Sequence, residues 1–267
     1  MSQKLLVSYC QGTLEQGSVL AMEKGTPIVG VMPFKEIKGN AYSFNVVDTL
    51  LPTDHRELGQ DVEADELQST KVTKNLVILT NSVRTDRVLA VMGDITDIKA
   101  EGQNLAMISS GKALERKVIA ELNQYLTNDE AGKKFTGTLS VDLLDDAFDY
   151  AEPNMIFVNN KGHRKLKRLL MDNGLMPETV ENFGRRVIAY NGVPVHVSHD
   201  LGDNEILMVR FAEDGTHGVT NSGLQVYEKE VGVHHVADTE LLYAVVCKTK
   251  NAFAKVELPE LKTSRSK

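Results

Sequence analysis

The stretch PNMIFVNNKGHRKLKRLL, residues Pro153–Leu170, begins with a short apolar run and ends with a dense basic one. Met155–Val158 has the length and composition of a buried strand. Five of the eight residues from Lys161 to Arg168 are Lys or Arg. The stretch therefore predicts a strand that leads into a basic helix, whose charge contacts either nucleic acid phosphates or other protein.

The overall charge balance bears on whether the basic helix contacts nucleic acid or protein. The chain has 267 residues, of which 37 are acidic and 30 are Lys or Arg, so the formal net charge is −7. A protein whose main task is to coat phosphates needs a net or strongly clustered positive surface. The balance thus favours protein as the partner of the basic helix, although it does not exclude a local basic patch.

Cysteine usage and hydropathy indicate where the protein works. Cys10 and Cys247 lie far apart and match no CxxC pattern, so a reducing cytoplasm is the natural setting. The first twelve residues contain only three adjacent apolar residues, too few for a signal peptide. The longest unbroken apolar run, Leu241–Cys247, is far shorter than the roughly twenty residues that span a bilayer. We expect a soluble protein that makes no membrane contact.

The first third of the chain predicts an arm followed by a long hairpin. Residues 1–35 carry few periodic cues, and we interpret them as an extended arm with one short helix. Two β-type segments, Asn40–Asp48 and Thr70–Thr80, flank an acidic excursion. An isolated hairpin is only marginally stable in water, so this hairpin must lie on another surface.

One long helix is predicted from about Asp97 to Leu126. Apolar residues on one of its faces recur at every fourth position: Leu114, Val118, Leu122 and Leu126. At about 1.5 Å per residue, this helix would be a rod of roughly 45 Å. Gly102 and Gly111 weaken it locally, so a kink or break there is an alternative.

Beyond residue 136, short helices alternate with short strands. The predicted elements are a helix at Ser140–Tyr150, a strand at Met155–Val158, a helix at Gly162–Asp172, a hairpin at Arg185–Val197 and a strand at Ile206–Phe211. The Asn191-Gly192 pair favours a type I′ turn in that hairpin. The last segments, 224–232 and 239–258, again predict long strands.

Two consecutive helices carry stripes of opposite charge, each spaced i, i+3, i+4, i+7. The acidic stripe is Asp142, Asp145, Asp146 and Asp149, and the basic stripe is Lys161, Arg164, Lys165 and Arg168. Carboxylates in this arrangement could bind a hard cation, but such clusters more often form a solvated or ion-pairing face. The simplest interpretation is that the stripes of neighbouring copies face each other in a ring.

Other signals of chemistry are weak. His196, His199 and Asp200 are of metal-ligand type, but residues three apart in a strand point to opposite faces. A metal-dependent hydrolase built on these histidines and the aspartates is therefore the remote alternative. Gly111-Lys112 lacks the glycine that a phosphate loop has five residues earlier, and no GxGxxG occurs. We expect no enzymatic activity, no cofactor and no metal site.

The order of the parts resembles the major capsid proteins of tailed phages, whose Hong Kong ninety-seven-like fold is shared with encapsulins. The similar features are the arm, the hairpin with a charged tip, the long spine helix and a small α/β domain in which NNKGHRKLKRLL precedes YNGVPVHVSHDLGDNEILMVRF. The resemblance implies an α+β fold with an N-terminal arm (1–35), an extended loop (36–80), a peripheral domain (81–136 and 225–267) and an axial domain (137–224).

The resemblance also implies a function. The protein would self-assemble as hexamers and pentamers into the icosahedral head of a tailed phage, enclosing double-stranded DNA through sparse, non-specific contacts. It would belong to the virion and assemble in the host cytoplasm, with a separate scaffolding protein or none, and with portal and decoration proteins as further candidate partners. An encapsulin-like compartment shell is the alternative. No lysine–asparagine pair for covalent cross-linking is recognisable in the sequence.

Within that assembly, we expect the acidic tip of the hairpin to dock on an adjacent subunit. The residues concerned are Asp61, Glu63, Asp65 and Glu66. A hairpin of this length loses much conformational entropy unless it docks, which favours a contact over a solvated loop.

Overall fold

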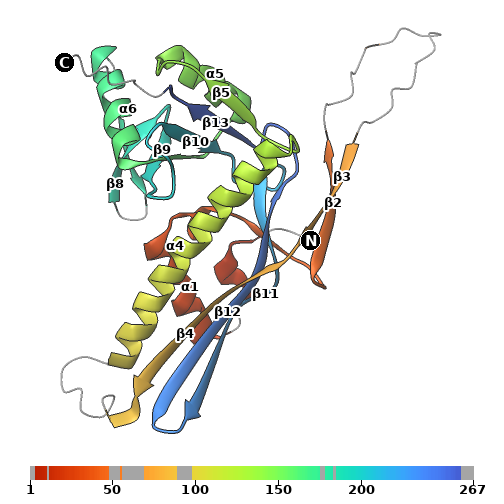
Figure 1. Cartoon of the computed structure of the whole chain (residues 1–267), viewed down its shortest axis with the longest axis vertical. Helices are drawn as coiled ribbons and strands as arrows, with labels where there is room; N and C mark the ends of the chain where they lie inside the picture. Colours follow the sequence, from red (N-terminus) through yellow and green to blue (C-terminus); the bar gives the residue numbers. More distant parts are fainter. Residues whose placement is uncertain are drawn as a thin grey trace, which may run out of the picture.

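A computed structural model of the chain shows an elongated α+β molecule (Figure 1). The structure describes residues 4–10, 12–47, 55, 69–88, 98–174, 178–182 and 185–259. The helices are η1 (Leu6–Tyr9, 3-10), α1 (Thr13–Gly25), α2 (Ile28–Val31), α4 (Ile98–Thr127), α5 (Val141–Ala151) and α6 (Asn160–Asp172). Within the described residues, no helix is long and apolar enough to cross a membrane.

The strands of the described residues form three sheets. They are β1 (Phe34–Glu36), β2 (Ala41–Val47), β3 (Ser69–Asn75), β4 (Val77–Asp86), β5 (Lys133–Thr136), β6 (Met155–Val158), β7 (Glu178–Asn182), β8 (Arg185–Tyr190), β9 (Val193–Val197), β10 (Glu205–Val209), β11 (Thr216–Val231), β12 (His234–Cys247) and β13 (Phe253–Glu257). The sheet orders are β1-β11-β12-β4, β5-β13-β10-β6-β9-β8-β7, and the separate pair β2-β3.

The four-stranded sheet and α4 form the long axis of the molecule (Figure 1). Strands β11 and β12 make a long antiparallel hairpin, and β4 pairs antiparallel with β12. Helix α4 packs along β4, where the Asn81 side chain donates a hydrogen bond of 3.0 Å to the carbonyl of Ala106. At the other end of α4, the buried Tyr125 hydroxyl donates to the carbonyl of Val245 at 3.1 Å. The helix is therefore fixed to the sheet along its length.

Helix α4 is continuous through both glycines, so the alternative of a break is not realised. Gly111 lies where α1 crosses α4. A Cβ added at Gly111 would lie under 3.0 Å from the carbonyl oxygen of Met22, and one at Gly25 would be equally close to the carbonyl oxygen of Ile108. Glycine at both positions permits this close approach of two backbones.

The N-terminal segment contains more regular structure than the predicted extended arm with one short helix. Helix α1 has 13 residues and packs on α4, and β1 pairs in parallel with β11. The large apolar side chains of this segment are completely buried: Leu6, Met22, Ile28, Met32 and Phe34. Sequence periodicity did not reveal this because the segment's apolar residues contact several different elements rather than one continuous face.

The seven-stranded sheet is covered on both faces. Ile156 and Val158 of β6 belong to the core formed with α5 and α6, whereas Met155 and Phe157 belong to the core that includes α4. Burial on both faces explains why β6 is an unbroken apolar run, as is typical of a central strand. The prediction of a buried strand leading into a helix is confirmed.

Most other predicted elements are confirmed, with three changes in pairing. Asn191 and Gly192 have φ values of 47° and 77°, as a type I′ turn requires. The predicted strand at Thr70–Thr80 is divided at the buried Leu76, so that β3 pairs with β2 and β4 pairs with β12. Strands β5 and β13 pair within the seven-stranded sheet, and β11 lies wholly in the four-stranded one. Sheet pairing therefore crosses the expected boundaries at 136/137 and 224/225.

Candidate assembly surfaces

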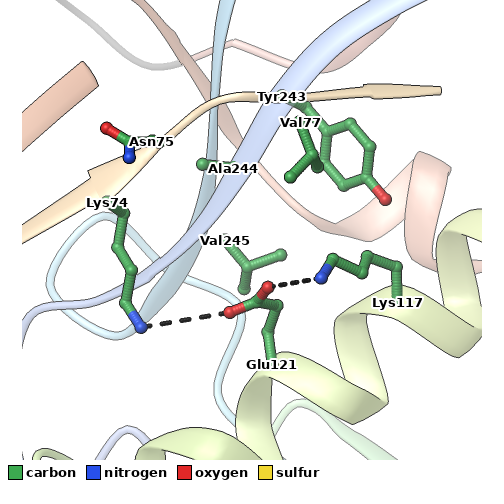
Figure 2. A pocket seen from close by; sticks show the side chains of 8 residues that line it. All are labelled: Lys74, Asn75, Val77, Lys117, Glu121, Tyr243, Ala244 and Val245. Atoms are coloured by element: carbon green, nitrogen blue, oxygen red, sulfur yellow. Dashed lines mark ion pairs between the residues drawn. The ribbon is translucent and has the colours of Figure 1, made fainter. Parts of the chain in front are cut away.

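The β2–β3 hairpin projects from one side of the molecule (Figure 1), and Lys74 fixes its root to α4. The Nζ atom of Lys74 lies 4.1 Å from the centre of the Tyr125 ring. It also lies 3.9 Å from Oε2 of Glu121 and 3.6 Å from Oε2 of Glu130. Figure 2 shows Lys74 and Lys117 paired with the same Glu121 carboxylate, which Lys117 contacts at 2.8 Å.

Aromatic side chains extend this root along the hairpin. The rings of Tyr42 and Phe44 stack with centres 5.7 Å apart, and Phe44 and Val72 are buried in the main core. Lys35 donates a hydrogen bond of 3.2 Å to the Tyr42 hydroxyl. The described part of the hairpin therefore packs against the rest of its own chain. The predicted contact residues of its tip (Asp61, Glu63, Asp65 and Glu66) lie outside the described residues.

The acidic stripe is on α5, which begins after Ser140. The Ser140 side chain accepts a hydrogen bond of 3.2 Å from the Leu143 amide and so caps the helix. Asp145 is held within the subunit, because the Tyr190 hydroxyl donates to it at 2.6 Å. Burial, and then the adjacent Asp145, raise the pKa of Tyr190. The other three members are exposed: Asp142, Asp146 and Asp149. Three of the four carboxylates are thus open to a neighbour.

The basic stripe is partly neutralised by the loop before β10. Lys161 pairs with Asp203, and its hydrogen bond lowers the pKa of that carboxyl group. Lys165 donates a hydrogen bond of 2.6 Å to the Asn204 side chain. Arg164 donates to the backbone carbonyl of Asn160, and both Arg164 and Arg168 are exposed. The two arginines are therefore the members best placed to contact another molecule.

His196, His199 and Asp200, proposed as metal ligands, line one groove, but the aspartates of α5 are not brought to them. His196 lies on the α4 side of the sheet, with its ring centre 5.7 Å from that of Phe157, whereas α5 and its aspartates lie on the opposite side. In the part of the chain that the structure describes, no three His, Cys, Asp or Glu side chains are grouped to hold a metal ion.

A wide groove separates α1 and α4 from α6, β8 and β9. Charged and titratable side chains lining it include Lys24, Lys112, Arg116, His163, His199 and Asp200. Arg116 crosses the groove to Asp200 at 2.8 Å. At one wall lies Glu115, which is 5% exposed and 3.4 Å from His196. The groove thus lies between two parts of the molecule. We call the four-stranded sheet with α1 and α4 the α4 unit, and the seven-stranded sheet with α5 and α6 the seven-stranded unit.

The chain is similar to known proteins in structure but not in sequence. No protein-family model matches the chain, and no curated protein matches it in sequence. Solved structures match over nearly its whole length. The SrpI encapsulin of Synechococcus elongatus aligns with a TM-score of 0.66 at 16% identity, covering 96% of this chain and 91% of that one. The chain has the Hong Kong ninety-seven-like fold.

Other structures with the Hong Kong ninety-seven-like fold agree. The capsid of an empty GTA particle aligns with a TM-score of 0.64 at 14% identity, covering 88% of this chain and 90% of that one. A structure from Microbacterium phage Oxtober96 aligns with a TM-score of 0.60 at 13% identity, covering 87% and 90%. The fold inferred from the order of the parts is therefore confirmed, with α4 as the spine helix.

Two residues that hold this fold together were not recognised from the sequence. Nothing in the sequence distinguishes Lys74 from other lysines, because Tyr125, whose ring it contacts, is distant in the chain. Glu115 had a recognisable signal, because it lies with Gly111, Val118 and Leu122 on the buried face of α4. A carboxylate on a buried helical face requires partners, and the sequence alone does not name them.

Proposed function

We propose that the protein is the major capsid protein of a tailed phage, a structural subunit that self-assembles as hexamers and pentamers into an icosahedral head around double-stranded DNA. The observation that supports this most directly is the match of nearly the whole chain to subunits of closed particles. On this proposal the subunit belongs to the virion and assembles in the host cytoplasm. It acts by surface contacts, with no catalytic step.

The parts of the chain then take the roles of that assembly. Residues 36–80 are the extended loop, residues 137–224 contain most of the axial domain, and the α4 unit is the peripheral domain, with the N-terminal arm packed against it. The acidic loop tip docks on a neighbour, and contacts with packaged DNA are sparse because the chain carries a net charge of −7. Scaffolding, portal and decoration proteins are separate partners.

An encapsulin-like compartment shell is the second candidate. It is favoured by the match to the SrpI encapsulin, which covers 96% of this chain. The genes beside the coding sequence distinguish the two candidates, since a phage head gene lies among genes for portal and packaging proteins. Proteins that copurify inside the particles, identified by mass spectrometry, provide a second distinction.

Assembly itself is the first prediction. Purified subunits at raised concentration, with a scaffolding protein where one is encoded nearby, are expected to form uniform closed particles, because exposed charged residues of α5 and α6 are open to contact with other copies. Light scattering and cryo-electron microscopy measure this. A protein that stays monomeric at every concentration, with and without the scaffold, would contradict the proposal.

A second prediction concerns the exposed members of the two stripes. Replacing Asp142, Asp146 and Asp149 by Lys is expected to block assembly, as is replacing Arg164 and Arg168 by Glu. Combining both sets is expected to restore particles in part. Each exposed pair contributes only about 0.2–1 kcal/mol, so single replacements should have little effect.

The stripe residues that already have partners within the subunit are left unchanged in these variants, so that the fold itself is not disturbed. Asp145, Lys161 and Lys165 stay unchanged because they bind Tyr190, Asp203 and Asn204 within the subunit. Thermal unfolding of the unassembled variants should therefore match the unmodified protein. If the combined variant assembles no better than either set alone, the stripes do not face each other between subunits.

A further inference from the structure

Glu115 is a buried carboxylate in the middle of α4. Only 5% of the residue is exposed, and an ionised carboxylate away from water is costly unless it is hydrogen-bonded. Nε2 of His196 lies 3.4 Å from its Oε2 atom, and the hydroxyls of Thr26 and Ser198 also donate hydrogen bonds to it. Burial alone would raise the pKa of Glu115, but these hydrogen bonds outweigh burial and lower it. The carboxylate is therefore held in its charged form.

The partners of Glu115 come from different parts of the fold. Thr26 is the residue at which α1 ends, whereas His196 is in β9 and Ser198 follows that strand. The Thr26 hydroxyl accepts a hydrogen bond of 3.3 Å from the Ile28 amide, and the Ser198 hydroxyl accepts one of 3.2 Å from the Asp200 amide. Since each hydroxyl is oriented by backbone, its hydrogen is available for Glu115. One carboxylate thus joins α1, α4 and the seven-stranded unit.

Two further polar contacts join α4 to the seven-stranded unit: an exposed ion pair at Arg116 and a hydrogen bond at Asn123. The pair between Arg116 and Asp200 is in water, with 71% of the Arg116 side chain exposed, so it should contribute little. Near the end of α4, Lys255 of β13 donates a hydrogen bond of 3.0 Å to Asn123. Lys255 also lies 2.9 Å from Glu205, so this anchor is shared with the sheet. Glu115 and Lys255 thus make polar contacts at two separate points along α4, beside the apolar core that Met155 and Phe157 share with this helix.

We propose that Glu115, through His196 and Ser198, is a latch that fixes the orientation of the seven-stranded unit on the spine helix, and that this orientation sets the diameter of the assembled shell. The inference rests on the proposed function. The hairpin and α1 lie on one unit, and the charged helices α5 and α6 lie on the other. If both units contact neighbours, the angle between them influences the angle between successive subunits, and a closed assembly of one size needs that angle to stay within a narrow range.

The first test uses the unassembled subunit and does not depend on shell formation. Cys10 and Cys247 are buried, so new cysteines at the exposed positions Glu101 of α4 and Lys167 of α6 can be spin-labelled selectively. The label-to-label distance is expected to have one narrow distribution in the parent protein. Glu115→Gln should broaden it at least twofold, because the amide presents a donor group to side chains that are themselves donors.

The matched control is Arg116→Ala, the adjacent residue that also joins the two units, and its distance distribution should stay narrow. Ser198→Ala removes one donor and leaves the other partners of Glu115, so it should broaden the distribution less than Glu115→Gln. It also serves where Glu115→Gln does not fold. An unchanged narrow distribution in every folded latch variant would overturn the latch.

The second test measures shells by cryo-electron microscopy. The parent protein and Arg116→Ala are expected to give one particle diameter, whereas Glu115→Gln should give at least two size classes or open sheets. A single unchanged diameter together with a broadened subunit distribution would overturn the link between orientation and shell size. If the parent protein itself forms no particles, the proposed function fails, and the spin-label result still decides whether the latch exists.

Discussion

Replacing Gly111 by alanine is expected to destabilise the subunit by about 1–2 kcal/mol net, since overpacking a well-packed site costs roughly 1–3 kcal/mol. The new Cβ would lie under 3.0 Å from the carbonyl oxygen of Met22 and 3.4 Å from the Cα of Gly25. Both are backbone atoms of α1, so relief of the clash requires the whole helix to move. The gain of about 1 kcal/mol in helix propensity only partly offsets this cost.

Urea unfolding of the unassembled subunit measures this change. The matched control is Gly17→Ala in α1, where an added Cβ meets nothing within 4 Å. That variant is expected to be more stable than the parent by up to about 1 kcal/mol, because it gains helix propensity without a clash. Equal stability of Gly111→Ala and the parent protein would mean that the two helices do not cross as closely as described.

The same glycine shows what the sequence could and could not predict. The four-residue period of Leu114, Val118 and Leu122 predicted α4 almost to its ends, because a helix face is a local pattern. Gly111 was interpreted only as a weak point in that helix. Its role depends on α1, whose position comes from tertiary packing and not from the local pattern.

The α/β unit was predictable for a related reason. Asn191-Gly192 specified its turn, and the apolar run before the basic helix specified a central strand, each from a few adjacent residues. The membership of β13 in the seven-stranded sheet was not predictable, because pairing with β10 is a contact between distant segments. Likewise, the sequence placed both charged stripes correctly on helices but could not show that Asp145 and Lys161 are held within the subunit.

His217 is expected to make the unassembled subunit less stable as the pH falls from about 6.5 to 4. Its side chain is fully buried in β11, and neither ring nitrogen has a hydrogen-bond partner of normal geometry among the described residues. Burial, and then the charge of Lys248, lower the pKa of His217 to about 4, while the carbonyl of Gly215 opposes this weakly. The folded protein therefore resists protonation of this ring.

The sign and size of the effect follow from linkage. Between pH 6.5 and 4 the unfolded chain binds a proton at this histidine that the folded protein does not bind, so acid favours unfolding. A difference of about 2.5 pH units corresponds to roughly 3 kcal/mol at pH 4 and about 2 kcal/mol at pH 5. The carboxyl groups with lowered pKa values, such as Asp203 and Glu228, contribute with the same sign but mainly below about pH 5. The range from pH 6.5 to 5 therefore reports mainly on histidine.

Replacing His217 by Leu tests this assignment. The variant is expected to unfold at an equal or higher urea concentration at pH 7, because an apolar side chain removes two buried nitrogens that lack partners. Between pH 6.5 and 5 it should lose about 2 kcal/mol less stability than the parent protein. The comparison variant is His163→Gln, since burial also lowers the pKa of His163, but that ring is only partly buried and its removal should flatten the profile less. If His217→Leu keeps the full pH dependence of the parent protein, the acid sensitivity of the fold arises from another residue.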